Sequence, residues 1–450
     1  MRRCVFPIIF ATFSACSADN GVTTPAPGTK IRHVIIIMQE NRSFDTYFGT
    51  FPGADGIPMQ DGLPRECLPD PTNGTCIYPY HDTANVNVGG PHGAADAVAD
   101  IDGGTMAGFV ARALLVRATC KNPQDPSCHG GTDVMGYHDA HEIPNYWAYA
   151  ENFVLQDRMF EPAASWSLPT HLFMVSAWSA VCEIDQPFTC RNELQTPAGG
   201  TLVGGAWVPP KSGSYAWTDI TYLLHNNGIS WKYYVGKGSE PDCDDDAARC
   251  PQIPQRAETP SIWNPLPSFT TVRTDGELGN IQDVKNFFLD AENGRLPEVA
   301  WIVPDQNHSE HPPARVKDGE KYVTELINAV MASPQWDSTA IFVSWDDWGG
   351  FYDHVVPPKI DENGYGIRVP GLVISPYAKQ GYIDHQILSH DAYLKFIEAV
   401  FLGNQRLDPR TDGRPDPRPT VRESVRLLGD LRNDFDFTQS PRAPMILPPR

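Results

Sequence analysis

Residues 34–38 read Val-Ile-Ile-Ile-Met, an apolar run in which every residue except the last is β-branched. A run without polar alternation suits a strand that is buried on both faces, which is typical of a parallel sheet covered by helices. Similar runs recur at 298–303, 339–345 and 371–375. We therefore expect these four segments to be strands of the core.

Helical patterns lie between and after these runs. Apolar side chains recur at helical spacing over residues 322–331, with Pro334 just beyond, and a second such stripe covers 392–402. The alternation predicts an α/β fold, with a doubly wound, mostly parallel central sheet flanked by helices. The loop-rich stretches at about 50–135 and 180–280 are interpreted as insertions over the carboxyl edge of the sheet, where open α/β folds place their active sites.

The composition is that of a globular protein with an acidic surface. The chain has 450 residues, 41% of them hydrophobic and 20% charged, which excludes collagen-like, coiled-coil and wholly disordered classes. The formal net charge of −20 repels phosphate backbones and argues against nucleic acid as a partner. A phosphate-bearing substrate stays compatible with this charge, because a metal or a helix terminus can reverse the potential within one site.

The N-terminus has the parts of a secretory signal. A basic Met1-Arg2-Arg3 precedes an apolar stretch over 4–13 and the small residues of Ser14-Ala15-Cys16. We expect residues 1–15 to be a signal peptide; a buried first strand is the alternative. The segment also resembles a bacterial lipobox, although Phe13 is not the residue favoured there. The predicted locations are therefore the periplasm, the outer membrane through lipidated Cys16, or the medium.

The other eight cysteines fall into four pairs that are close in sequence. Closing a short loop is entropically favoured, so we expect four local disulfides that staple surface excursions in an oxidising compartment. Metal binding is the rival interpretation, but no pair has the two-residue gap of a zinc knuckle. The expected pairs are Cys67 with Cys76, Cys120 with Cys128, Cys182 with Cys190, and Cys243 with Cys250.

Two oxygen-bearing side chains follow the first strand. Glu40 and Asn41 come directly after Gln39, at the carboxyl end of the run at 34–38. A carboxylate and an amide oxygen facing a crevice are hard donors that suit a divalent cation. The alternative is a turn with a helix N-cap at Asn41 or Ser43.

A second acidic group follows the run at 339–345. Adjacent carboxylates, such as those of Asp346 and Asp347, repel each other at a strand end unless a cation or a proton lies between them. His354, eight positions after Asp346, could bind a metal, transfer a proton or cap a turn. A surface acidic turn is the alternative for the whole segment.

Two further residues have side chains that suit catalysis. Ser167 stands at the start of a helical pattern with Pro169 in its first turn, so it is either an N-cap or a nucleophile whose anion meets the positive helix end. His311 follows the strand at 298–303 and is either structural or a general acid.

Together these blocks make the chain similar to the bacterial phospholipase C and acid phosphatase family of phosphoesterases. The resemblance begins with the family's E-N-R-S-F-D signature and spans about residues 30–445, which we interpret as a single catalytic domain. The matching blocks, in chain order, are residues 40–45, 91–109, 135–147, 309–312, 346–355 and 366–370.

The resemblance implies an alkaline-phosphatase-like fold and one divalent metal ion of unspecified identity. The positions that match the family's metal ligands are Glu40, Asn41, Asp346 and Asp347, and its nucleophile falls at Ser167. The chain departs from the phospholipase pattern where Thr170-His171 replaces an Asn-Arg pair and where Asp347 replaces a glutamate. A serine nucleophile with two aspartates is more similar to the acid phosphatase branch.

The expected function is hydrolysis of a phosphate ester through a phosphoseryl intermediate. The metal would act as a Lewis acid while Ser167 attacks phosphorus. His354, His311 or His92 could supply the proton for the leaving group, and all three stay open. The substrate partner would be a phospholipid head group or a phosphomonoester. The alternative is an exported, non-catalytic binding protein on the same fold; a sulfatase is disfavoured because no cysteine lies in a C-x-[PA]-x-R context.

Overall fold

The structure is a computed structural model. It describes residues 30–119, 131–197, 201–203, 206–208, 214–240 and 252–450. Several sequence-based predictions fall outside these residues: the signal peptide at 1–15, the lipidation site Cys16, and the pairs Cys120–Cys128 and Cys243–Cys250.

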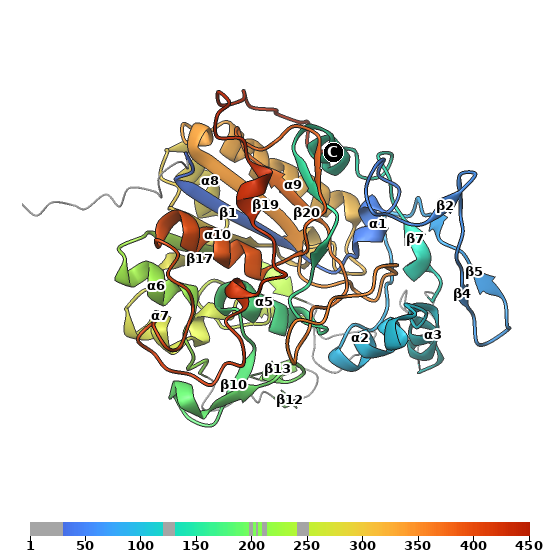
Figure 1. Cartoon of the computed structure of the whole chain (residues 1–450), viewed down its shortest axis with the longest axis horizontal. Helices are drawn as coiled ribbons and strands as arrows, with labels where there is room; N and C mark the ends of the chain where they lie inside the picture. The colour runs from blue at the N-terminus through green and yellow to red at the C-terminus, as the bar shows by residue number, and fades with distance from the viewer. Residues whose placement is uncertain (1–29, 120–130, 198–200, 204–205, 209–213, 241–251) are drawn as a thin grey trace, which may run out of the picture.

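Among the described residues, eight strands form one central sheet (Figure 1). Its most central strand, β1, is apolar and buried from Val34 to Met38 and pairs in parallel with a strand on either side. Ile35 is in register with Ala300 on one neighbour and with Ile341 on the other. In spatial order the strands are β17 (Ile281–Asp283), β14 (Trp231–Val235), β18 (Val299–Val303), β1 (His33–Gln39), β19 (Thr339–Trp345), β20 (Gly371–Ile374), β8 (Val154–Gln156) and β21 (Tyr382–Asp384).

The four predicted apolar runs are all strands of this sheet, but β20 does not run parallel to the others. It pairs antiparallel with β19, where Ile374 faces Ile341, and antiparallel with β8. An apolar run records burial on both faces and carries no information on direction. The chain between β19 and β20, residues 346–370, contains no helix, and an antiparallel neighbour needs no crossover helix.

The helices form two groups, which lie on opposite sides of the sheet in Figure 1. Both predicted helical stripes are confirmed, because the apolar residues of 322–331 are buried in α9 and those of 392–400 in α10. One group comprises α4 (Pro144–Asn152), α8 (Lys285–Glu292) and α9 (Val316–Met331), and the other α5 (Ser167–Ser176), α6 (Ile220–Asn226) and α10 (Asp391–Phe401). The doubly wound α/β prediction is therefore confirmed.

Part of the predicted insertion at 180–280 belongs to the core. The segment 231–235 is strand β14, which pairs with β18 inside the central sheet. The prediction missed it because Lys232 interrupts the apolar run of this short strand. Lys232 Nζ forms an ion pair with Asp290 at 2.5 Å, so its charge is compensated at the sheet. The strands β8, β17 and β21 have three residues each, too few to show a period.

The stretch at 50–135 is an excursion with a small core of its own. It follows the short helix α1 (Phe44–Phe48) and includes α2 (Ala94–Ile101) and α3 (Phe109–Thr119). Phe109 and Met106 pack in a second hydrophobic cluster that also contains Trp348, which follows the acidic pair after β19. This contact brings the excursion to the carboxyl edge of the sheet, as predicted.

The remaining short elements include two-stranded pairs, several 3-10 turns and one short helix. The pairs and the helix are β2 (Met59–Gln60) with β3 (Leu63–Pro64), β4 (Leu68–Pro69) with β5 (Cys76–Ile77), β6 (Tyr80–His81) with β7 (Gly136–Tyr137), β9 (Met159–Phe160) with β22 (Leu388–Ser389), β10 (Ala180–Cys182) with β11 (Cys190–Asn192), β12 (Thr201–Val203) with β13 (Ala206–Val208), β15 (Gly238–Glu240) with β16 (Ile253–Gln255), and α7 (Thr270–Thr274). Across the described residues, no helix is both long and apolar enough to span a membrane.

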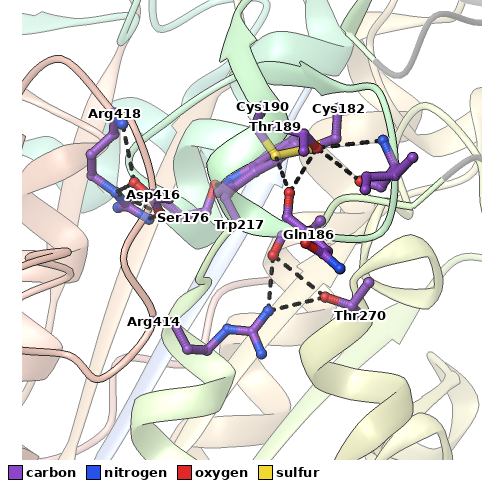
Figure 2. Close-up of a disulfide and its surroundings, with 12 residues drawn as sticks. Ser176, Cys182, Gln186, Thr189, Cys190, Trp217, Thr270, Arg414, Asp416 and Arg418 are labelled. Carbon is purple, nitrogen blue, oxygen red and sulfur yellow. Dashed lines mark hydrogen bonds and ion pairs between the residues drawn. A yellow bond between two sulfur atoms is a disulfide. The ribbon is translucent and has the colours of Figure 1, made fainter.

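Two predicted disulfides are confirmed, Cys67–Cys76 and Cys182–Cys190. The second joins β10 to β11, with the two Cα atoms 3.8 Å apart, and Figure 2 shows it beside Gln186 and Thr189. The hydroxyl of Thr189 donates to the Gln186 carbonyl at 2.8 Å, so a local hydrogen bond also forms inside the loop that the disulfide closes. Disulfides of this kind fit an oxidising compartment.

Candidate active site

The two predicted groups of oxygen donors meet at the carboxyl edge of the sheet. Strands β1 and β19 are parallel neighbours, and Gln39, the last residue of β1, is in register with Trp345, the last of β19. Glu40 and Asp346 are the next residues on each strand, so the parallel pairing itself places them side by side. The backbone N–H of Asp346 donates to the Gln39 carbonyl at 2.8 Å, which extends the ladder by one step.

Asn41 ties the two groups together. Its backbone N–H donates to Asp346 Oδ1 and its side-chain Nδ2 donates to Asp347 Oδ1, each at 2.8 Å. Asn41 has a φ of 58°, in the left-handed region that asparagine tolerates better than most residues. A Cβ at Gly349 would lie 2.7 Å from the Asn41 Cβ, so this approach requires glycine at position 349.

Ser167 lies within the same cluster. It is the first residue of α5, and its Oγ donates to Asp347 Oδ2 at 3.2 Å. The N-cap position is Trp166, which makes no side-chain cap. Ser167 is therefore not the N-cap serine of the alternative interpretation, and its hydroxyl stands at the positive end of a ten-residue helix.

His171 joins the cluster, and sequence reasoning did not name it as a site residue. It lies one turn after Ser167 on α5, with Nε2 3.2 Å from Glu40 Oε1 and 4.0 Å from Asp346 Oδ2. A spacing of four residues on a helix places two side chains on one face. That spacing from Ser167 was the signal in the sequence that could have identified it.

The cluster has the donor set and the burial of a cation site. Glu40, Asn41, Asp346 and Asp347 are all fully buried. Two oxygens, Asn41 Oδ1 and Asp346 Oδ2, have no hydrogen-bond partner among the residues that the structure describes. Buried oxygens of this kind cost free energy unless a hydrogen bond or a cation satisfies them. Ligand atoms of Glu40, His171 and Asp346 lie within 4.8 Å of one another, so the residues fit one divalent ion.

A further buried carboxyl group lies near this cluster. Burial, followed by the charge of Asp347, raises the pKa of Glu161 well above its ordinary value. One of its oxygens accepts from the backbone N–H of Ile367 at 2.8 Å. The cluster and its surroundings therefore concentrate acidic groups, and a cation there would relieve their mutual repulsion.

His92 and His311 lie together beside the cluster. Their ring centroids are 5.7 Å apart, with the planes nearly perpendicular. The His92 ring is also 6.3 Å from that of Trp348, the residue after Asp347. His311 Nδ1 lies 2.7 Å from the carbonyl oxygen of Pro312, which fixes the orientation of the imidazole.

His354 belongs to a different group of charges. Its Nδ1 lies 2.7 Å from Asp45 Oδ2, and Arg368 pairs with both Asp45 and Asp353, at 3.0 and 2.9 Å. Burial lowers the pKa of His354, but the nearby Asp45 carboxylate outweighs this effect and the net shift is upward. No hydrogen bond or ion pair recorded among the described residues joins His354 to Ser167 or to the four oxygen donors.

A buried carboxyl group supports the site from the side of the sheet. Glu310 accepts hydrogen bonds from the hydroxyls of Tyr47 and Tyr146, both at 2.6 Å, and from Trp345 Nε1 at 3.0 Å. Burial raises the pKa of Glu310 to about 7. Glu310 precedes His311 and contacts Trp345. Its hydrogen bonds therefore hold both the histidine and the end of β19 in place.

Known proteins resemble the chain in sequence over most of its length. The non-hemolytic phospholipase C of Burkholderia pseudomallei is 27% identical over 91% of this chain and 59% of its own length. Phospholipase C B of Mycobacterium tuberculosis is 28% identical over 84% of this chain and 75% of its own length. The chain thus spans less than two thirds of the Burkholderia relative.

Solved structures resemble the chain more distantly. A protein in the alkaline phosphatase superfamily from Vibrio parahaemolyticus has a TM-score of 0.37 and 10% identity, over 84% of this chain and 68% of its own. The sequence model of the Phosphoesterase family matches residues 31–402, a range that includes both groups of oxygen donors, Ser167 and His311. The chain belongs to the phosphoesterase family.

Proposed function

We propose that the protein is a metal-dependent phosphoric ester hydrolase with Ser167 as its nucleophile. One divalent ion would be held by Glu40, Asn41, Asp346 and Asp347. The observation that carries the proposal is the 3.2 Å contact from Ser167 Oγ to Asp347 Oδ2, because Asp347 also accepts from Asn41. A hydroxyl, two carboxylates and an amide from three distant segments thus converge at one buried point.

The ion would supply Lewis acidity toward a phosphoryl oxygen and toward the serine hydroxyl. Ser167 attacks phosphorus, the bond to the departing alcohol breaks, and water then hydrolyses the phosphoseryl ester. The first-turn N–H groups of α5 face the negative charge that develops beside Ser167. Asp347 orients the hydroxyl before attack through its hydrogen bond.

His92 and His311 are the residues that we propose for handling the leaving group's proton. They lie side by side next to Trp348, whereas His354 contacts Asp45 in the other charged group. An alcohol leaves more readily when a general acid protonates it, and an imidazole titrates in the right range. His354 is then a positioning residue of the surrounding fold.

The site and the relatives support two candidate substrate classes. Both relatives named above are phospholipases C, so a phosphodiester with a head group is one candidate. Two features favour a phosphomonoester: the serine nucleophile, and His171 in place of the arginine of the phospholipase pattern. We also propose that the protein is exported, with residues 1–15 removed and Cys16 available for a lipid anchor, which the two disulfides support.

The test is hydrolysis by the full chain of p-nitrophenyl phosphate and p-nitrophenyl phosphorylcholine, with and without a chelator. The proposal expects turnover of at least one ester, loss with chelator and recovery on adding a divalent ion. Ser167→Ala should abolish turnover while the protein stays folded; retention of a tenth of the activity would remove Ser167 from this role. If neither ester is turned over at any pH, the binding-protein alternative is favoured.

A further inference from the structure

We infer that His171 is a ligand of the cation, so that the site has one nitrogen donor besides its oxygen donors and prefers zinc-like transition metals to Ca²⁺ or Mg²⁺. This inference rests on the proposed function only in requiring that the cluster bind a divalent ion. It gives the ion a chemical class and gives His171 a role.

The first support is geometric. His171 Nε2 lies 3.2 Å from Glu40 Oε1 and 4.0 Å from Asp346 Oδ2, and all three side chains are fully buried. Two ligand atoms that each lie about 2.1 Å from one ion, at roughly a right angle, are about 3 Å apart. The 3.2 Å separation is close to this value, and the 4.0 Å separation is within the span of about 4.2 Å that two such bonds can reach.

The second support is the placement of His171 on α5. The same helix face presents Ser167 Oγ to Asp347 and, one turn later, His171 Nε2 to Glu40 and Asp346. One rigid helix thus sets the distance between the nucleophile and the nitrogen donor. A ligand on this helix would couple occupancy of the metal site to the position of Ser167.

The third support comes from the oxygens that the cluster leaves unsatisfied. Asn41 Oδ1 and Asp346 Oδ2 are buried without a hydrogen-bond partner among the described residues, and Asp346 Oδ2 is the atom that His171 approaches at 4.0 Å. These atoms come from β1 and β19, while His171 comes from α5. A single ion between them would satisfy groups from three elements.

The donor type decides which ions fit. Carboxylate and carbonyl oxygens suit Mg²⁺, Ca²⁺ and Mn²⁺, whereas an imidazole adds preference for Zn²⁺, Fe²⁺, Co²⁺ or Ni²⁺. The arginine that occupies this position in the phospholipase pattern keeps its proton and cannot bind a metal. A histidine at position 171 therefore changes what the site can bind.

The test is X-ray absorption spectroscopy of the untagged full chain, stripped of metal and reloaded with Co²⁺. Wild type should show the outer-shell scattering of one bound imidazole, and His171→Gln should not. His138→Gln is the matched control, since His138 is equally buried but bonds to Asn87; it should keep the imidazole signal. Zn²⁺ affinity by calorimetry should fall at least about 100-fold in His171→Gln, with Ca²⁺ affinity changed less than about threefold.

Persistence of the imidazole signal in His171→Gln would overturn the inference, as would equal losses of Zn²⁺ and Ca²⁺ affinity. If His171→Gln does not fold, the wild-type spectrum still decides, because absence of imidazole scattering rejects the inference. Hydrolysis by an enzyme that lacks the imidazole signal would reject the inference alone. An imidazole-bound ion in a protein that hydrolyses no phosphate ester would reject the proposed function alone.

Discussion

Two clusters of buried charge lie close together in sequence but solve the problem of burial differently. In the cluster around Arg368, a guanidinium pairs with Asp45 and Asp353, and His354 completes the group. In the cluster at the ends of β1 and β19, Asp346 Oδ2 lacks a hydrogen-bond partner among the described residues. The first cluster contains its own cation. The second cluster has donors for a cation that would come from solution. This difference separates a structural ion-pair group from a candidate binding site.

Glu310 shows a third solution. It accepts three hydrogen bonds from Tyr47, Tyr146 and Trp345, and burial raises its pKa to about 7. Near neutral pH this carboxyl group is therefore partly protonated. Three buried acidic groups within one fold thus differ in their compensation: one pairs with an arginine, one is partly protonated, and for the third we propose a metal ion.

The largest expected effect is the loss of catalytic efficiency in Asp347→Asn. Asp347 contacts both Ser167 and Asn41, so the change should lower kcat/KM at least about 10³-fold, because both metal binding and the orientation of the nucleophile are lost. Thermal unfolding should move little. An activity loss below tenfold would contradict the assignment of Asp347 to the metal.

Arg368→Met should have the opposite effect: a large loss of stability with little change in metal affinity. Removing one partner of a buried ion pair leaves Asp45 and Asp353 uncompensated and should lower the free energy of unfolding by about 3–5 kcal/mol. Urea unfolding measures this, and calorimetry of the folded fraction should find metal affinity close to wild type. A variant that is stable but fails to bind metal would show that the two clusters are not separate.

Glu310→Gln tests whether the buried carboxyl group of Glu310 is stabilised by its proton. Because the pKa of Glu310 in the folded protein is raised to about 7 from 4.5, its contribution to stability is complete below pH 4.5 and is lost as pH rises toward 7. The loss is about 3 kcal/mol. Unfolding curves between these pH values should show a weaker pH dependence in Glu310→Gln than in wild type. Equal slopes would contradict the assigned pKa.

The smallest expected effect lies outside all three groups. Replacing both Cys182 and Cys190 by serine should lower the unfolding free energy by about 2–3 kcal/mol, because the short loop gains freedom in the unfolded chain. Hydrolysis measured well below the melting temperature should be unchanged. A loss of activity without a loss of stability would place this disulfide in the function of the site.

The sequence predicted the parts of the fold that are recorded locally. The apolar runs of β1 and β19 and the stripe of α9 gave correct elements, and the polar residues after each strand gave the position of the oxygen donors. Strand direction is not local, so the prediction of a mostly parallel sheet did not identify β20 as an antiparallel strand. Strand β14 was missed because Lys232, balanced by Asp290 far away in sequence, interrupts its pattern.

The site shows the same limit. Ser167 and the paired acidic groups could be named from their neighbours in sequence. The contacts of His171 with Glu40 and of Arg368 with Asp45 join residues 131 and 323 positions apart. Nothing in either local segment specifies its partner, so the separation of one acidic group into a site and another into an ion pair required the fold.

The most direct measurement is a crystal structure of the full chain soaked with Zn²⁺ and orthovanadate, with anomalous data at the zinc edge. We predict one strong peak within about 2.0–2.6 Å of oxygens of Glu40, Asn41, Asp346 and Asp347, with vanadium bonded to Ser167 Oγ. An anomalous peak at any other cluster, or vanadium bonded away from Ser167, would contradict it.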